Sequence, residues 1–208
     1  MSRTRSALIW ICLTAVLLVP LYAAAASPLL AWRDPVYIVA GFAGVVALSL
    51  LVVQPLLILG ALPGMRGSRA RGAHRWVGIG LMVAVVLHLV GLWITSPPDV
   101  VDALLFVSPT PFSAWGVIGM WAVFAGGALA LFRGRLKIRY RTWRRAHLTL
   151  AVLVVLGSVI HAVQIQGTME TVSKILLCAA ALCATAVLLW RVFPKAALRL
   201  SRPRTRGP

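Results

Sequence analysis

The chain contains six apolar stretches that are each long enough to cross a lipid bilayer, and this feature limits its fold more than any other. A helix needs about 20 residues to span the hydrocarbon core, which is about 30 Å thick. No water reaches that core, so a spanning segment must satisfy its own backbone groups as a helix. With 61% hydrophobic residues, the chain of 208 is too apolar for an ordinary soluble domain. The expected spans are residues 7–26, 36–62, 73–95, 112–132, 143–163 and 175–193.

The basic residues sort the loops onto two sides. In a six-helix chain, all but Arg33 and Lys174 of the 21 Lys and Arg residues lie on the side of the two termini, and all four acids lie on the opposite side. Positively charged loops stay in the cytoplasm. We therefore expect an all-α integral membrane protein, a six-transmembrane-helix bundle with cytoplasmic N- and C-termini, in a bacterial inner membrane.

The net charge of +17 does not indicate a nucleic-acid partner. The sidedness of membrane proteins already explains the excess of positive charge, and anionic membrane lipid is the expected counter-charge. Two interpretations of the N-terminal segment remain open, a signal peptide and a first transmembrane helix. Residues 1–26 have the outline of a signal peptide, but their apolar run has the length of a span, which favours a retained helix.

All four histidines fall into two pairs with one spacing. His74 and His88 are 14 residues apart, and so are His147 and His161. At about 100° per residue, 14 steps return to within about 40° of the starting direction, so both members of a pair share one helix face. Both helices run outward from the cytoplasm. We therefore expect His74 and His147 at one depth and His88 and His161 at another, about 21 Å away.

Two imidazoles at each depth suit a haem better than a zinc ion. Zinc needs four ligands at one point, and no acid or suitably placed cysteine completes such a set. A haem needs only two axial ligands, and imidazole is a common one. The chain has no CxxCH motif, so two non-covalent b-type haems are expected. Haem propionates need cationic partners. The candidates beside the inner histidines are Arg71, Arg75, Arg144 and Arg145.

A haem-free transporter that relays protons through histidines is an alternative from another class of function. Such a relay would need ionisable groups at intermediate depths. Residues 76–87 and 148–160 contain none, which favours the haem interpretation.

Two segments resemble the ferric-reductase-like transmembrane domain, and the resemblance covers roughly residues 34–193. That superfamily includes eukaryotic ferric reductases, NADPH oxidases and the haem-binding membrane subunit of a bacterial periplasmic methionine sulfoxide reductase. The resemblance implies a two-haem path for electrons across the membrane, with the inner haem on His74 and His147 and the outer haem on His88 and His161. The matching residues are Arg71, His74, Arg75, Trp76, Gly78 and His88, then Trp143, Arg144, Arg145, His147 and His161.

Ferric reductases and NADPH oxidases carry a flavin and nicotinamide domain after the last helix. Here a short basic tail, residues 194–208, follows the last span, and no GxGxxG loop is present. We therefore expect a stand-alone bacterial member that takes electrons from a separate cytoplasmic flavin reductase or from a quinol. The acceptor stays open among a ferric chelate, a periplasmic reductase, quinone and oxygen.

Three functions follow from these observations. The first is oxidoreductase-type electron transfer through haem, with partner proteins needed for turnover and flavin or quinone as further cofactors. The second is a haem-binding anchor for a periplasmic reductase, and the third is the transporter. The expected organisation is a first helix and external loop (residues 1–33), a haem-binding membrane domain (34–193) and the cytoplasmic tail (194–208).

Overall fold

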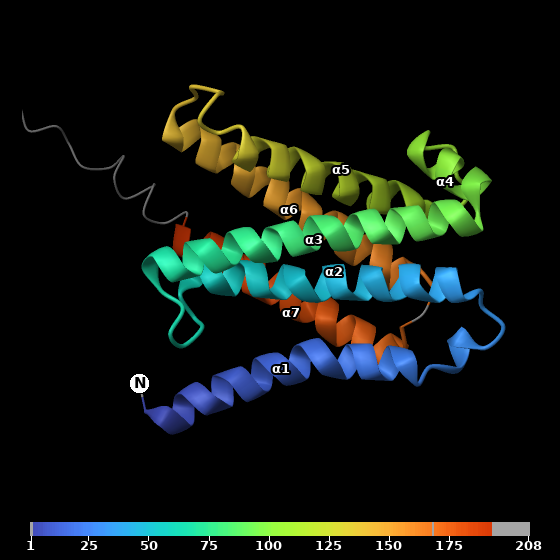
Figure 1. Ribbon diagram of the computed structural model, residues 1–208, viewed down its shortest axis with the longest axis horizontal. Helices are drawn as coiled ribbons and strands as arrows, with labels where there is room; N and C mark the ends of the chain where they lie inside the picture. The colour runs from blue at the N-terminus through green and yellow to red at the C-terminus, as the bar shows by residue number, and fades with distance from the viewer. Residues whose placement is uncertain (1, 168, 193–208) are drawn as a thin grey trace, which may run out of the picture.

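The computed structural model describes residues 2–167 and 169–192. This part of the chain folds into seven α-helices and a short 3-10 turn, Pro28–Leu30, and contains no strand (Figure 1). Six of the helices are long and apolar enough to cross a membrane, which confirms a multi-pass helical fold. The helices are α1 (Arg3–Ala25), α2 (Pro35–Leu59), α3 (Gly67–Thr95), α4 (Pro97–Leu104), α5 (Pro111–Leu131), α6 (Tyr140–Gln164) and α7 (Thr171–Val192).

The six expected spans correspond one to one to α1, α2, α3, α5, α6 and α7. Four of these helices begin three or more residues earlier than hydropathy marks them, because their first turns are polar or basic. They begin at Arg3, Gly67, Tyr140 and Thr171. Residues 96–111, which lie between two of the expected spans, are not a simple loop. The eight-residue helix α4 forms there, with Pro97 in its first turn and Val100 buried. Residues 193–208, which include the expected tail, lie outside the described residues.

Side chains cap the first turns of three of the spans. Ser2 caps α1 by accepting a hydrogen bond from the backbone N–H of Arg5. Asp34 caps α2 by accepting hydrogen bonds from the backbone N–H groups of Val36 and Tyr37. Glu170 caps α7 in the same way, and the backbone hydrogen bonds from Ser173 and Val172 lower the pKa of its carboxyl group. The first turns of α3 and α6 have no side-chain cap, so their N–H groups stay available to an anion.

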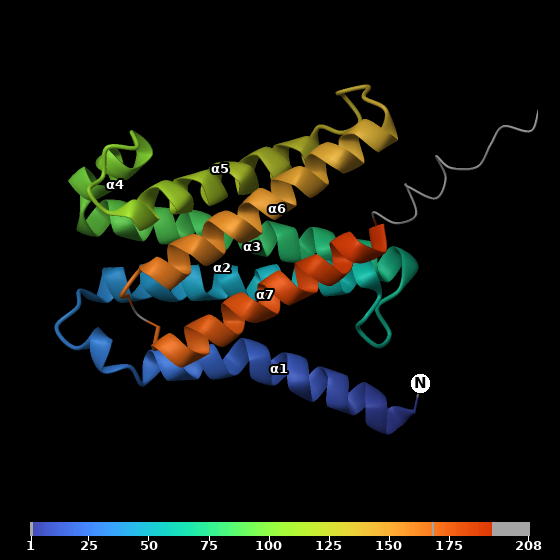
Figure 2. The same cartoon turned by 180° about the vertical axis from the view of Figure 1, so that it is seen from behind.

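Two antiparallel hairpins form the centre of the bundle. α2 packs along α3, and α5 packs along α6, while smaller contacts join α3 to α5 and α2 to α6. The four helices therefore form a ring in which α3 and α6 lie across from each other (Figures 1 and 2). α7 covers the ring on its α2 and α6 side, and α1 packs at the edge against α2 and α7.

Glycines bring the helices of each hairpin close together. A Cβ atom on Gly157 of α6 would lie 2.8 Å from the Trp115 carbonyl oxygen and 3.0 Å from the Gly119 nitrogen, both on α5. A Cβ atom on Gly91 of α3 would lie 2.7 Å from the Cβ of Ala40 on α2. Side chains larger than hydrogen cannot fit at these crossings without a shift of backbone. The close approach fixes each supporting helix against the helix that carries histidines.

Lys174 lies where the sequence did not lead us to expect it. We placed it on the side opposite the termini, just before the last expected span, but it belongs to the first turn of α7 and is buried, with 6% of its surface exposed. Its Nζ atom donates a hydrogen bond to the Ile165 carbonyl oxygen at 2.8 Å. Because the last carbonyls of a helix lack partners within it, this contact ties the end of α6 to α7.

Candidate functional site

The structure brings the four histidines together in two pairs. The ring centroids of His74 and His147 are 6.2 Å apart, and those of His88 and His161 are 6.4 Å apart. We call these the inner pair and the outer pair. The inner pair lies toward the end of the bundle where α1 begins and α7 ends, and the outer pair lies toward the opposite end. Each pair joins α3 to α6 across the ring.

The separation within each pair matches the space that one metal ion needs. A bond from an imidazole nitrogen to a first-row metal is about 2 Å long. The ring itself adds about 1 Å on each side, so two imidazoles that share a metal have centroids about 6 Å apart. Among the described residues, no group of three or more His, Cys, Asp or Glu side chains could hold a metal ion. Each pair therefore offers two ligands, the number that a haem iron takes from protein.

Backbone carbonyls orient both outer histidines. His88 Nδ1 lies 2.7 Å from the Ala40 carbonyl oxygen, and His161 Nδ1 lies 2.9 Å from the Phe112 carbonyl oxygen. A carbonyl oxygen can only accept, so each Nδ1 must carry the proton and donate it. The lone pair then belongs to Nε2. A second-shell bond of this kind is the usual device that presents a histidine to a metal.

A glycine makes room for each of these imidazoles. Gly44 and Gly116 lie four residues after Ala40 and Phe112 on α2 and α5. A Cβ atom on Gly44 would lie 3.1 Å from His88 Nδ1, and one on Gly116 would lie 2.7 Å from His161 Nδ1. We call Ala40 with Gly44, and Phe112 with Gly116, the carbonyl–glycine cradles. Sequence reasoning missed them, although both elements recur at one offset of 72 residues, close to the offset of 73 between the histidine pairs.

The inner pair is held differently. The Nδ1 atoms of His74 and His147 are buried and have no hydrogen-bond partner in the described part of the chain. The Gln54 backbone lies beside the His74 ring without forming a well-aligned hydrogen bond. The Gln54 side chain is also at this level, with Nε2 3.2 Å from the Cβ position of Gly78 and an unpaired, buried Oε1. Buried polar atoms without partners are rare in folded proteins, so these three atoms mark this level of the bundle as a candidate site.

Stacked aromatic rings support His147. The indole ring of Trp143, one turn earlier on α6, lies parallel to the imidazole, with centroids 5.3 Å apart and planes at 6°. The indole N–H donates to the Leu129 carbonyl oxygen at 3.1 Å, and the Arg133 guanidinium lies over the indole at 4.6 Å. Trp143 is thus fixed by α5 and by the loop that follows it, and it fixes the plane of His147.

The four arginines expected to bind propionates are all exposed, and they divide into two sets. Arg71 and Arg144 line a cavity of about 670 Å³ together with Arg66, Arg191 and Tyr140. Arg75 and Arg145 do not line it. Position on the helix explains the difference. Arg71 precedes His74 by three residues and lies near its face, whereas Arg75 follows it directly and lies about 100° away.

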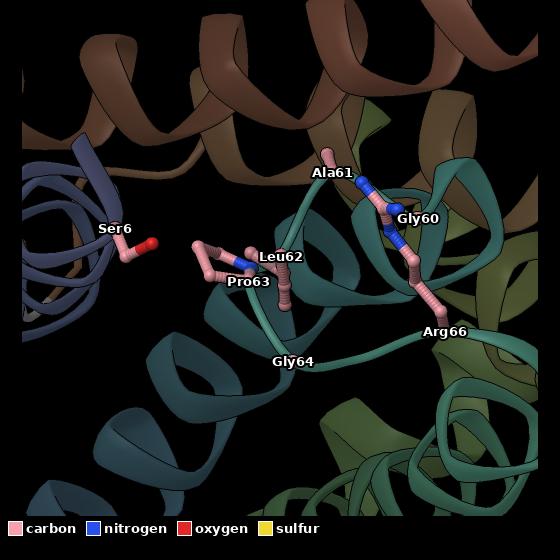
Figure 3. A pocket seen from close by; sticks show the side chains of 7 residues that line it. All are labelled: Ser6, Gly60, Ala61, Leu62, Pro63, Gly64 and Arg66. Carbon is pink, nitrogen blue, oxygen red and sulfur yellow. The ribbon is translucent and has the colours of Figure 1, made fainter. Parts of the chain in front are cut away.

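Residues at the end of α2, in the first turns of α3 and α6 and at the end of α7 line the cavity, so it lies at the inner-pair end of the bundle. A second hollow of about 260 Å³ adjoins it and shares Gly60 and Arg66. Figure 3 shows this hollow between Ser6 of α1 and the turn after α2, with the Arg66 guanidinium turned back toward Gly60. This end of the bundle is therefore both hollowed and strongly basic.

Comparison with known proteins identifies a family for most of this region. The model of the "Ferric reductase like transmembrane component" family matches residues 40–158. The match includes His74, His88 and His147, and it ends three residues before His161. Neither a curated protein nor a solved structure gives a match to the chain. Because the family model covers more than half of the 208 residues and the fold is a bundle of membrane-spanning helices, the chain belongs to the ferric reductase like transmembrane component family.

Proposed function

We propose that this protein transfers electrons across a bacterial inner membrane through two b-type haems, one on the inner pair and one on the outer pair. Membership of the family indicates transmembrane electron transfer in general terms. The observation that carries the finer proposal is the meeting of two imidazole pairs, with centroids 6.2 and 6.4 Å apart, across one helix ring. A bound haem supplies the one-electron chemistry, and the chain supplies ligands, orientation and surroundings.

Apolar side chains line the space between the two pairs. Leu81 and Ala84 of α3 and Val154 and Val155 of α6 lie between the histidine levels and belong to the buried core. The levels are separated by residues 76–87 and 148–160, which carry no ionisable side chain. A relay of protons would require such groups, so this arrangement favours electron transfer over the haem-free transporter.

The basic cavity supports entry of electrons from the side of the inner pair. Arg66, Arg71, Arg144 and Arg191 would attract a negatively charged donor, such as an anionic reduced flavin or an acidic flavoprotein. The same arginines favour a cytoplasmic location for this end, by the positive-inside rule. Arg71 and Arg144 are also placed to neutralise haem propionates, with Arg75 and Arg145 as exposed neighbours. A quinol donor and a periplasmic reductase acceptor remain as partners to be identified.

A reduced-minus-oxidised absorption spectrum of the purified full chain tests the proposal, with haem quantified per chain. We expect two haems per chain. His161→Ala should remove one haem and leave the other, because only the outer pair loses a ligand. Thr149→Ala, at an exposed position of α6 between the two histidines, is the matched control and should keep both haems. A colourless preparation from cells with ample haem would refute the proposal.

A pull-down of the full chain from its native membrane separates electron transfer to small acceptors from the role of haem-binding anchor. Stoichiometric recovery of one periplasmic reductase, together with loss of haem oxidation when that partner is removed, would favour the anchor. Oxidation of the haems by a ferric chelate alone would favour a reductase in its own right.

A further inference from the structure

The two histidine pairs differ in how their Nδ1 atoms are satisfied, although the spacing that creates them is the same. In the outer pair both Nδ1 atoms donate to backbone carbonyls of the neighbouring helix, at 2.7 and 2.9 Å. In the inner pair neither Nδ1 atom makes a hydrogen bond of good geometry among the described residues, although the Gln54 backbone lies beside the His74 ring. The sequence alone does not reveal this difference, because a carbonyl oxygen belongs to every residue.

The difference has a definite chemical consequence for a metal on Nε2. A hydrogen bond from Nδ1–H to a carbonyl pushes electron density into the ring and makes Nε2 a stronger donor. A stronger donor stabilises ferric iron more than ferrous iron and so lowers the reduction potential. The outer imidazoles are therefore stronger ligands than the inner ones.

The distribution of charge acts in the same direction. Arg71 and Arg144 lie one turn before the inner histidines, and positive charge near a haem favours the reduced form. Burial acts in the opposite direction, since the outer pair is the more deeply buried and burial favours the form with less charge. A test must therefore change the hydrogen bond while it leaves burial unchanged.

We infer, on the basis of the proposed function, that the carbonyl–glycine cradles of α2 and α5 are positioning elements that make the outer haem the stronger reductant of the two. Gly44 and Gly116 are the residues that permit this, because a Cβ atom at either position would push the imidazole away from the carbonyl four residues earlier, by more at Gly116 than at Gly44. An external acceptor would then take electrons from the outer haem, which has the lower of the two reduction potentials. A negative-inside membrane potential favours outward movement of electrons and would offset the unfavourable step between the two levels.

A redox titration of the two-haem protein, followed in the α-band, tests the inference. We expect two resolved one-electron waves. In His161→Ala, which retains the inner haem, the remaining wave should be the one at higher potential. Survival of the lower-potential wave in this variant would overturn the inference.

Substitution of the cradle glycines tests the cause. In Gly116→Ala the added Cβ would lie 2.7 Å from His161 Nδ1, so the ring must move off the Phe112 carbonyl, and the lower wave should shift upward. Gly44→Ala meets His88 at 3.1 Å and should shift the same wave by a smaller amount. Gly126→Ala is the control on α5, because a Cβ there meets nothing within 4 Å, and it should leave both waves in place.

The outcomes distinguish the inference from the proposed function. A preparation without haem fails the proposed function. A two-haem protein in which Gly116→Ala and Gly44→Ala move neither wave, or move both waves equally, fails only the inference. If Gly116→Ala loses the outer haem altogether, the milder Gly44→Ala variant tests the inference. An upward shift of the lower wave alone supports it, and the absence of a shift overturns it.

Discussion

At the scale of single residues, Trp143 shows how the inner pair is oriented without a hydrogen bond. Its indole lies parallel to the His147 imidazole and is itself fixed by the Leu129 carbonyl and by Arg133. We expect Trp143→Leu to lower occupancy of the inner haem several-fold, because the imidazole loses its stacking partner, whose aromatic contact is worth about 1 kcal/mol. Haem content per chain measures the effect. Trp76→Leu, at a tryptophan of α3 with 73% of its surface exposed, is the matched control and should keep two haems. An equal loss in both variants would mean that Trp143 acts through general stability.

The pairing of the histidines was open to sequence reasoning because it depends only on helix period and direction. Fourteen residues bring His74 and His88 onto one face, and two helices of one direction bring equal depths together. The hydrogen bonds that orient the outer histidines could not be predicted from the sequence. Ala40 and Phe112 contribute only their carbonyl oxygens, which any residue type carries. Arg71 lines the cavity and Arg75 does not, and this difference follows from helix angle alone.

At the scale of the helices, close glycine contacts decide how firmly each hairpin holds. Gly157→Ala would place a methyl group 2.8 Å from the Trp115 carbonyl oxygen and 3.1 Å from the Gly119 Cα. Both neighbours are backbone atoms, so α5 and α6 must separate, and we expect a loss of about 1–3 kcal/mol in stability. Thermal unfolding in detergent measures this as a lower midpoint, and Gly126→Ala should leave the midpoint unchanged. A midpoint for Gly157→Ala equal to that of the parent protein would show that the crossing tolerates a methyl group.

The helices themselves were largely predictable, because each span needs about 20 apolar residues and little else in a chain produces such runs. The first and last residues of the helices were less predictable. Hydropathy ends where arginines begin, yet α3 and α6 continue to Gly67 and Tyr140 because a helix tolerates charge once it leaves the apolar layer. Helix α4 was not predicted because eight residues are too few to give a hydropathy signal, although Pro97 and Pro98 mark its first turn.

At the scale of the whole molecule, charge and cavity coincide at one end of the bundle. Four arginines line the cavity at the inner-pair end, whereas the opposite end carries the acids of the described chain, Asp34, Asp99, Asp102 and Glu170. Charges on an open surface attract a partner over a Debye length of about 10 Å at 0.1 M salt and over less at higher salt. A negatively charged donor should therefore reach the inner side faster at low salt than at high salt.

Stopped-flow reduction of the protein, loaded with the two haems that we propose, by an anionic reduced flavin measures this dependence. We expect the second-order rate constant to fall by about tenfold from low to high salt, at the lower end of the range for electrostatic steering. Arg71→Gln combined with Arg144→Gln should slow the reaction at low salt and flatten its salt dependence, because both side chains line the cavity. Arg33→Gln, at an exposed arginine of the opposite end, is the control and should retain the full dependence. A rate constant that does not change with salt in the parent protein would show that the basic cavity does not attract the donor. Electrons would then enter elsewhere, and a neutral quinol in the membrane would be the expected donor.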